Sequence, residues 1–130
     1  MDRVCHFEVP FDEKERMEKF YADVFGWQFH PAPDGVPYTF AFTTEVDEQF
    51  KPKTAGGING GSYQRTEGMA TAPVLVLEVE SCEQRIKDVE AAGGVKVTAP
   101  VQVGDMGIYA QVKDTEGNII GIWQQLGQSS

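Results

Sequence analysis

The sequence contains 130 residues, of which 41% are hydrophobic and 24% are charged. This length and composition are typical of one folded domain with its own core, and they exclude a disordered chain. The formal net charge of −9 argues against a nucleic acid or an anionic membrane as a partner, since phosphate contacts need a basic surface. No apolar run is long enough to cross a membrane, and Cys5 and Cys82 do not form a CxxC motif. We therefore expect a reduced, cytoplasmic protein with a single domain over residues 1–130.

The first half of the chain begins with the alternating segment VCHFEVPF, which predicts a strand over residues 4–11 with His6 and Glu8 on the same face. Asp12 is placed to cap the helix that follows, and Gly26 is placed to end it in a left-handed conformation. Three more strands are expected, at about 27–29, 38–44 and 56–64.

The second half repeats this order after a polar linker at 65–73. A strand is expected over Val74–Val79, and Ser81 with Gln84 forms the pattern of a capping box at the start of a second helix. Gly93 and Gly94 are expected to end that helix. The remaining strands are predicted at 95–97, 108–113 and 119–124, the last two joined by the turn sequence DTEGN.

The two halves correspond without a gap at an offset of 68 residues, which places Val9 over Leu77 and Gly26 over Gly94. Self-similarity at a fixed spacing is the sequence signature of repeated structural units. We therefore predict two successive βαβββ modules, one at about 4–65 and one at about 74–126.

The segment HFEVPFDEKERMEKFYADVFGW resembles the first module of the vicinal oxygen chelate superfamily, the group of glyoxalases, bleomycin resistance proteins and extradiol dioxygenases. VLVLEVESCEQRIKDVEAAGG and DTEGNIIGIWQ resemble the second module and its ending. The resemblance implies an α+β fold in which two tandem βαβββ modules form curled mixed sheets around a central cavity. Because many members are homodimers, it also implies that this chain forms a homodimer.

Members of this superfamily that use a metal hold one divalent ion with residues from the first and fourth strands of each module. Carried over to this chain, the resemblance places His6 at the first of these positions, but Val74 and Gly121 stand at two others. Asn59 is the nearest match to the remaining position, and a neutral amide is a weak ligand. We therefore expect no cofactor, although Glu8 and Glu78 could contribute to an unusual divalent metal site.

The expected ligand pocket contains five residues, namely His6, Glu8, Asn59, Gly121 and Trp123. His6 and Glu8 are either an acid and a base or simply polar residues that line a wet cavity. Gly121 would enlarge the pocket, and Trp123 is either an aromatic wall for a flat ligand or a packed core residue.

The function expected from these residues is the binding of a small, possibly aromatic molecule, without glyoxalase I activity. One alternative is a lyase, isomerase or dioxygenase-type enzyme that uses an atypical metal site or metal-free acid–base catalysis by His6 and Glu8. A second alternative is a structural or interaction protein whose cavity has no ligand.

Overall fold

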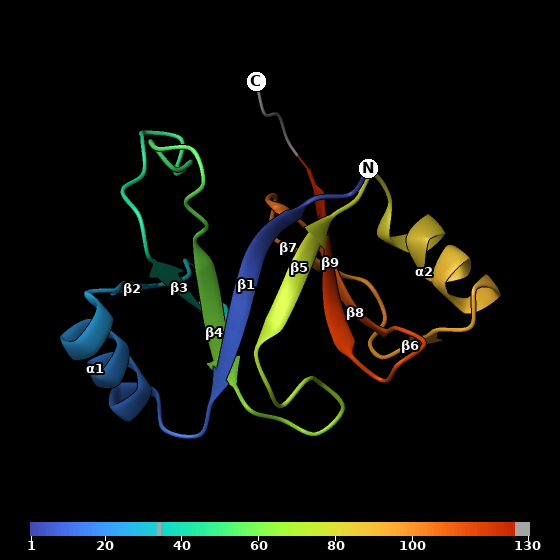
Figure 1. Ribbon diagram of the computed structural model, residues 1–130, viewed down its shortest axis with the longest axis horizontal. Coiled ribbons are helices and arrows are strands. Elements are labelled where there is room, and N and C mark those ends of the chain that lie inside the picture. The colour runs from blue at the N-terminus through green and yellow to red at the C-terminus, as the bar shows by residue number, and fades with distance from the viewer. Residues whose placement is uncertain (34, 127–130) are drawn as a thin grey trace. The chain divides into compact units, whose positions relative to one another are not determined.

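The computed structural model describes residues 1–33 and 35–126, and Figure 1 shows the arrangement of their helices and strands. The elements follow one another as β1 (Val4–Phe11), α1 (Lys14–Phe25), β2 (Gln28–Pro31), β3 (Thr39–Phe42), β4 (Gly60–Gln64), β5 (Val74–Glu78), α2 (Cys82–Ala91), β6 (Val95–Lys96), β7 (Val101–Val103), β8 (Gly107–Lys113) and β9 (Ile119–Gln125). Neither α1 nor α2 is long and apolar enough to span a membrane.

The chain divides into two compact units, which are described separately. The first unit contains residues 6–65 and 71–73, and the second contains residues 1–5, 66–70 and the chain from residue 74 onward. The strands of the first unit are ordered β2-β3-β4-β1, with β1 and β4 parallel and the other pairs antiparallel. Those of the second unit are ordered β6-β8-β9-β5, with β5 and β9 parallel, and β7 is added beside β8.

The two units therefore share one topology, and the predicted α+β fold with repeated βαβββ modules is confirmed. The first strands keep the offset of 68 residues, because Glu8 lies opposite Gly61 in one unit and Val76 lies opposite Gly121 in the other. The last strands do not keep it, since Gly61 and Gly121 are 60 residues apart. Two features of the strands were not predicted. Strand β4 begins only at Gly60, and the short strand β7 has no counterpart in the first module.

Helix α1 begins differently from the prediction and ends as predicted. Its N-cap residue is Glu13, which makes no side-chain capping bond, so the assignment of Asp12 as the cap is wrong. The Asp12 carboxylate instead forms an ion pair with Arg65 at 2.7 Å, and this pair joins the end of β1 to the residue that follows β4. Gly26 ends the helix with a φ of 77°, a left-handed conformation that glycine adopts without a steric penalty.

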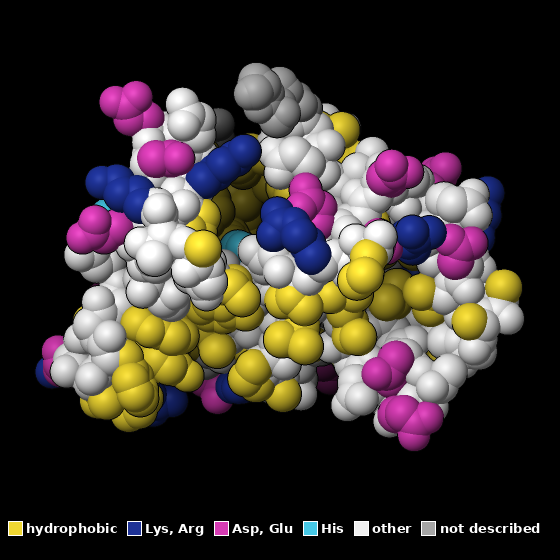
Figure 2. Space-filling view, turned by 45° about the horizontal axis from the view of Figure 1, so that its top comes forward, with side chains coloured by type: hydrophobic (Ala, Val, Ile, Leu, Met, Phe, Trp, Pro, Cys, Tyr) yellow, Lys and Arg dark blue, Asp and Glu magenta, His cyan; other side chains and the backbone are white. Residues whose placement is uncertain are grey.

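Helix α1 also leaves much of its apolar stripe uncovered. Phe20, Val24 and Phe25 are 54%, 58% and 61% exposed, and no residue of the helix is buried. Figure 2 shows hydrophobic side chains gathered at the lower left, on the side of the view where Figure 1 places α1. An exposed apolar patch of this kind often marks an interaction surface.

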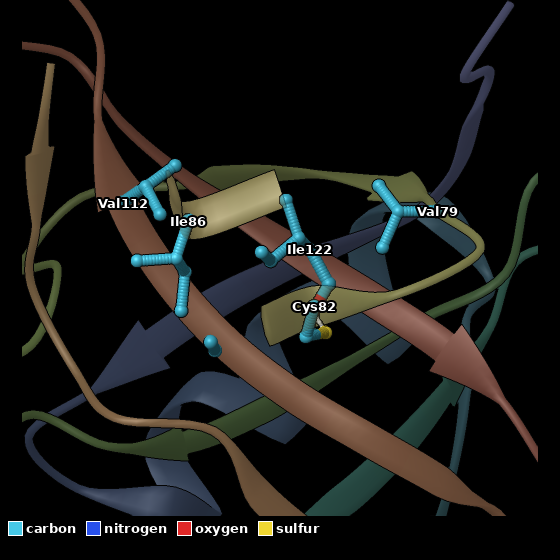
Figure 3. Packing of buried hydrophobic residues seen from close by; sticks show 6 residues of the cluster. Val79, Cys82, Ile86, Val112 and Ile122 are labelled. Atoms are coloured by element: carbon cyan, nitrogen blue, oxygen red, sulfur yellow. Dashed lines mark hydrogen bonds between the residues drawn. The ribbon is translucent and has the colours of Figure 1, made fainter. Parts of the chain in front are cut away.

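Helix α2 has the predicted N-cap residue, Ser81, although the Gln84 side chain bonds Asp88 and does not complete the predicted capping box. The Ser81 hydroxyl accepts a hydrogen bond from the Gln84 backbone N–H at 3.1 Å, and Gly93 follows the helix with a φ of 101°. The main buried cluster of this unit consists of Val79, Cys82, Ile86, Ala110, Val112 and Ile122, of which Cys82 and Ile86 belong to the helix. Figure 3 shows these side chains from close by. The opposite face of the sheet carries a second, smaller buried cluster of Ala70, Val74 and Val76.

Candidate functional site

Strand β1 divides its side chains between the two faces of the first sheet. Phe7 lies on the side of α1, where its ring centroid is 5.4 Å from that of Trp27, and Trp27 stacks on Tyr21 at 4.5 Å. Because successive strand residues alternate, His6 and Glu8 lie on the opposite face. The predicted pairing of these two residues on one face thus follows from the strand itself.

The His6 and Glu8 side chains are joined by the hydroxyl group of Tyr38. The hydroxyl donates a hydrogen bond to Glu8 Oε2 at 2.9 Å, and it lies 2.8 Å from His6 Nε2. Glu8 is only 3% exposed, so this bond supplies a donor to a buried carboxyl group. His6 and Glu8 were predicted as an acid and a base or as polar residues lining a wet cavity, and the structure places a tyrosine hydroxyl between them.

The chain His6–Tyr38–Glu8 depends on a glycine in β4. A Cβ atom at Gly61 would overlap with the hydroxyl end of Tyr38. Gly61 lies opposite both Glu8 in β1 and Phe40 in β3, so the tyrosine crosses the sheet at the point where three strands meet. Gly61 therefore makes room for the side chain that connects His6 with Glu8.

Aromatic rings continue from Tyr38 along the same face. The centroid of Tyr38 lies 5.7 Å from that of Phe40, and the centroids of Phe40 and Phe42 are 6.4 Å apart. Tyr38 was not among the predicted site residues. A usable signal was present in YTFAF, where an aromatic residue at every second position of a strand places all three rings on one face.

The surroundings of His6 favour its neutral form. Burial lowers the pKa of the imidazole from 6.5 to about 4, because partial removal from water disfavours the positive charge. At neutral pH the ring therefore carries one proton, and one of its two nitrogen atoms is a hydrogen-bond acceptor.

Asn59, a predicted pocket residue, has a structural role in the first unit. Its Oδ1 atom accepts hydrogen bonds from the backbone N–H groups of Thr43 and Thr44, at 2.8 and 3.1 Å. The predicted register is also wrong by two residues, because Gly61 and not Asn59 is the counterpart of Gly121. The oxygen of Asn59 thus holds the ends of β3 and β4 together.

In the second unit, Tyr109 occupies the space above Gly121. A Cβ atom at Gly121 would lie 3.0 Å from the Tyr109 hydroxyl and 3.1 Å from Val76. The expectation that Gly121 enlarges a pocket is therefore wrong, since the tyrosine ring covers it. The Tyr109 hydroxyl accepts a hydrogen bond from Gln111 Nε2 at 2.7 Å, and the Gln111 Oε1 atom accepts one from the Ala70 N–H.

Trp123 lies beside this tyrosine and packs at the edge of a small apolar cluster. It pairs with Tyr109 across β8 and β9, and its neighbours in the cluster include Val74 and Val76. Its ring occupies the space next to Gly107, and its Nε1 donates a hydrogen bond to Gln125 at 3.0 Å. Both predicted interpretations of Trp123 stay open, because the ring is partly exposed and partly packed.

The residues at the four metal-ligand positions do not fit a divalent ion. The register assigns them to His6, Gly61, Val74 and Gly121, of which only His6 has a side chain that can coordinate. Tyrosine side chains occupy the spaces above both glycines. Within residues 1–33 and 35–126, no three His, Cys, Asp or Glu side chains are grouped so that they could hold a metal ion.

Comparisons with known proteins agree with this fold. Residues 3–41 match the family model described as bleomycin resistance protein-like N-terminal. A hypothetical protein from Bacillus halodurans is 13% identical, with a TM-score of 0.63 over 99% of this chain and 98% of that chain. No curated protein sequence matches the chain.

Two methylmalonyl-CoA epimerases are similar in structure. A variant from Streptomyces coelicolor, in complex with 2-nitronate-propionyl-CoA, is 10% identical, with a TM-score of 0.64 over 98% of this chain and 97% of that chain. The enzyme from Mycobacterium tuberculosis is 13% identical, with a TM-score of 0.58 over 95% and 87%. At such identities the structural likeness shows the fold alone. Together with the family match over residues 3–41, this fold agrees with the resemblance of the sequence to the vicinal oxygen chelate superfamily.

We expect the substitution Gly61→Ala to be more destabilising than Gly121→Ala. At Gly61 the new methyl group displaces the end of Tyr38 and breaks its bonds to His6 and Glu8, at a cost of roughly 1–3 kcal/mol. At Gly121 a shift of a few tenths of an ångström accommodates the methyl group. Urea unfolding of both variants measures the difference, and equal losses of stability would show that the Tyr38 bonds contribute nothing.

We expect His6 to make the protein less stable as the pH falls from 6.5 toward 4. The unfolded chain binds a proton at His6 with the ordinary pKa of 6.5, whereas the folded chain does so only near pH 4. Stability from this residue is therefore complete above pH 6.5 and is lost by at most about 1.4 kcal/mol per pH unit below it. The unfolding free energies of the wild type and of His6→Gln should converge as the pH falls from 7 to 4. If the difference between the two free energies stays constant over this range, the pKa of His6 is not lowered.

Proposed function

We propose that the protein binds a small, flat, aromatic molecule on the face of the first sheet that carries His6, Tyr38 and Phe40, and that no metal ion takes part. The observation that carries this proposal is the hydrogen-bond chain from His6 through Tyr38 to Glu8. It fixes a few polar atoms beside a row of aromatic rings. Ligand sites typically combine an apolar wall with a small number of positioned polar groups.

The second unit supports a role without metal. Val74 and Val76 stand at the positions that correspond to His6 and Glu8, so the equivalent face is apolar. The family match over residues 3–41 is to the model described as bleomycin resistance protein-like N-terminal, which supports a role in binding a small molecule. Glyoxalase I activity is not expected, because the carboxylate ligands on which it relies are replaced by glycine.

A second candidate function is acid–base catalysis on the same face. The Tyr38 hydroxyl contacts both His6 and Glu8, so a proton at one end of the chain can be balanced at the other. The similar epimerases show that the fold can support an isomerase. The two candidate functions are distinguished by incubating a bound compound with the protein and analysing it by chromatography. A binding protein leaves the compound unchanged, whereas an enzyme converts it to a product.

We expect neutral aromatic compounds to raise the melting temperature and divalent metal ions to have no effect. A compound present at one hundred times its dissociation constant adds about 2.7 kcal/mol to the stability of the folded state. The shift should decrease in His6→Ala and persist in Lys87→Ala, because Lys87 is exposed on α2 in the second unit. A stoichiometric metal ion in protein purified without chelators would contradict the proposal, and so would the absence of a shift with every aromatic compound.

The exposed stripe of α1 offers a surface for the homodimer that the resemblance implies. We propose that Phe20, Val24 and Phe25 pack against a second copy, since a two-fold interface brings the same apolar patch together from both chains. Light scattering should give the mass of two chains for the wild type and of one for Phe20→Glu. The matched control is Phe50→Glu, which changes a phenylalanine that is 73% exposed in a loop; a wild-type monomer, or loss of the dimer in both variants, excludes this interface.

A further inference from the structure

We propose that the ligand of the first unit donates a hydrogen bond to Nδ1 of His6, and that its recognition group is a neutral hydroxyl on an aromatic ring. This inference rests on the proposed binding function and adds the chemical class of the ligand. It predicts that phenols bind and that carboxylates and α-ketoaldehyde adducts do not.

The direction of the hydrogen-bond chain carries the first step. A tyrosine hydroxyl has one proton, and that of Tyr38 is donated to Glu8 Oε2 at 2.9 Å. The Tyr38 oxygen can therefore only accept from His6, whose Nε2 atom lies 2.8 Å away. The neutral imidazole carries its single proton on Nε2, which leaves Nδ1 with a free electron pair as the acceptor.

The hydrogen-bond chain from His6 through Tyr38 to Glu8 is fixed in position by the fold. Glu8 is 3% exposed and Gly61 leaves the space for the Tyr38 hydroxyl, so neither end of the tyrosine bond can move without disturbing the sheet. A carboxylate at the far end of the chain favours a proton on Nε2 by attracting the proton of Tyr38. Among the residues that the structure describes, the ring makes its hydrogen bond through Nε2, so Nδ1 stays available for a ligand.

Anions and carbonyl compounds do not fit the hydrogen-bond acceptor on His6. An anion would place a second negative group beside the electron pair of His6 and close to the Glu8 carboxyl group, and a carbonyl compound would have no proton to donate. The low pKa of His6, about 4, means that the ring does not become a cation that could attract an anion near neutral pH. Phe40 and Phe42 supply flat apolar contacts for the ring of a phenol.

The first experiment compares matched ligands. Several phenols and their methyl ethers, which keep the ring and lose the donor, are titrated by calorimetry into the wild type, His6→Phe and His30→Gln. We expect each phenol to bind at least tenfold more tightly than its ether to the wild type and to His30→Gln. In His6→Phe, which keeps a flat ring and loses the acceptor, the two should bind equally.

The second experiment observes the tautomer directly. The sequence contains two histidines, so His30→Gln leaves the His6 imidazole as the only one in the ¹⁵N spectrum. We expect a protonated Nε2 and an unprotonated Nδ1 at pH 7, and a change of the Nδ1 resonance when a phenol is added. A proton on Nδ1 overturns the inference even in the absence of any ligand.

The outcomes separate the two proposals. If aromatic compounds bind but phenols and ethers bind equally well to the wild type, the proposed function stands and the inference about the donor is wrong. If no aromatic compound binds at all, both are wrong.

Discussion

The buried carboxyl group of Glu8 is the constraint on which the rest of the first unit's site depends. A carboxyl group that is 3% exposed needs hydrogen-bond donors, and the Tyr38 hydroxyl is one of them. That hydroxyl reaches Glu8 only because the residue opposite in β4 is Gly61. In the arrangement that we propose, the same hydroxyl accepts a hydrogen bond from Nε2 of His6. One buried group thus accounts for a glycine, a tyrosine and the state of a histidine that are far apart in the sequence.

The two units use the same steric arrangement with different polarity. In each, a tyrosine two residues before the partner of a β-strand glycine lies over that glycine: Tyr38 over Gly61, and Tyr109 over Gly121. The first-strand residues beside them are His6 and Glu8 in one unit and valines in the other. The first unit can therefore orient a polar group of a ligand, whereas the second offers mainly apolar contact.

Local signals in the sequence were sufficient for both helices, for most of the strands and for the repeat. Gly26 and Ser81 act on backbone groups within a few residues of themselves, and the faces of His6 and Glu8 follow from alternation along one strand. Asp12 has the same capping chemistry, but its pair with Arg65 depends on a strand far along the chain. The residues around Asp12 therefore did not indicate that Arg65 would bind its carboxylate in place of the helix N-terminus.

The site required the register between strands, which the sequence does not specify. The segment GGINGG allows several alignments, and a shift of two residues keeps the same face, so alternation could not separate Asn59 from Gly61. The role of Tyr38 depends on that choice, since it directly precedes β3 and reaches Glu8 of β1 across the intervening strand β4. Glycine also has two opposite meanings at such a position. It can open a pocket, as was expected for Gly121, or it can admit a neighbouring ring, as the structure shows.

The tyrosines change how the missing metal ligands should be understood. A glycine at a ligand position suggests a site that has merely lost a carboxylate and that a single substitution would restore. Here a glutamate at position 61 or 121 would have to displace a tyrosine ring, and at position 61 it would also remove a donor from Glu8. The carboxyl group of Glu8 would then be left with one bond fewer in a buried environment, which is unfavourable in itself. The tyrosine arrangement and a metal arrangement therefore exclude each other in the first unit, and the polar chain is better regarded as a different solution for the same face of the sheet.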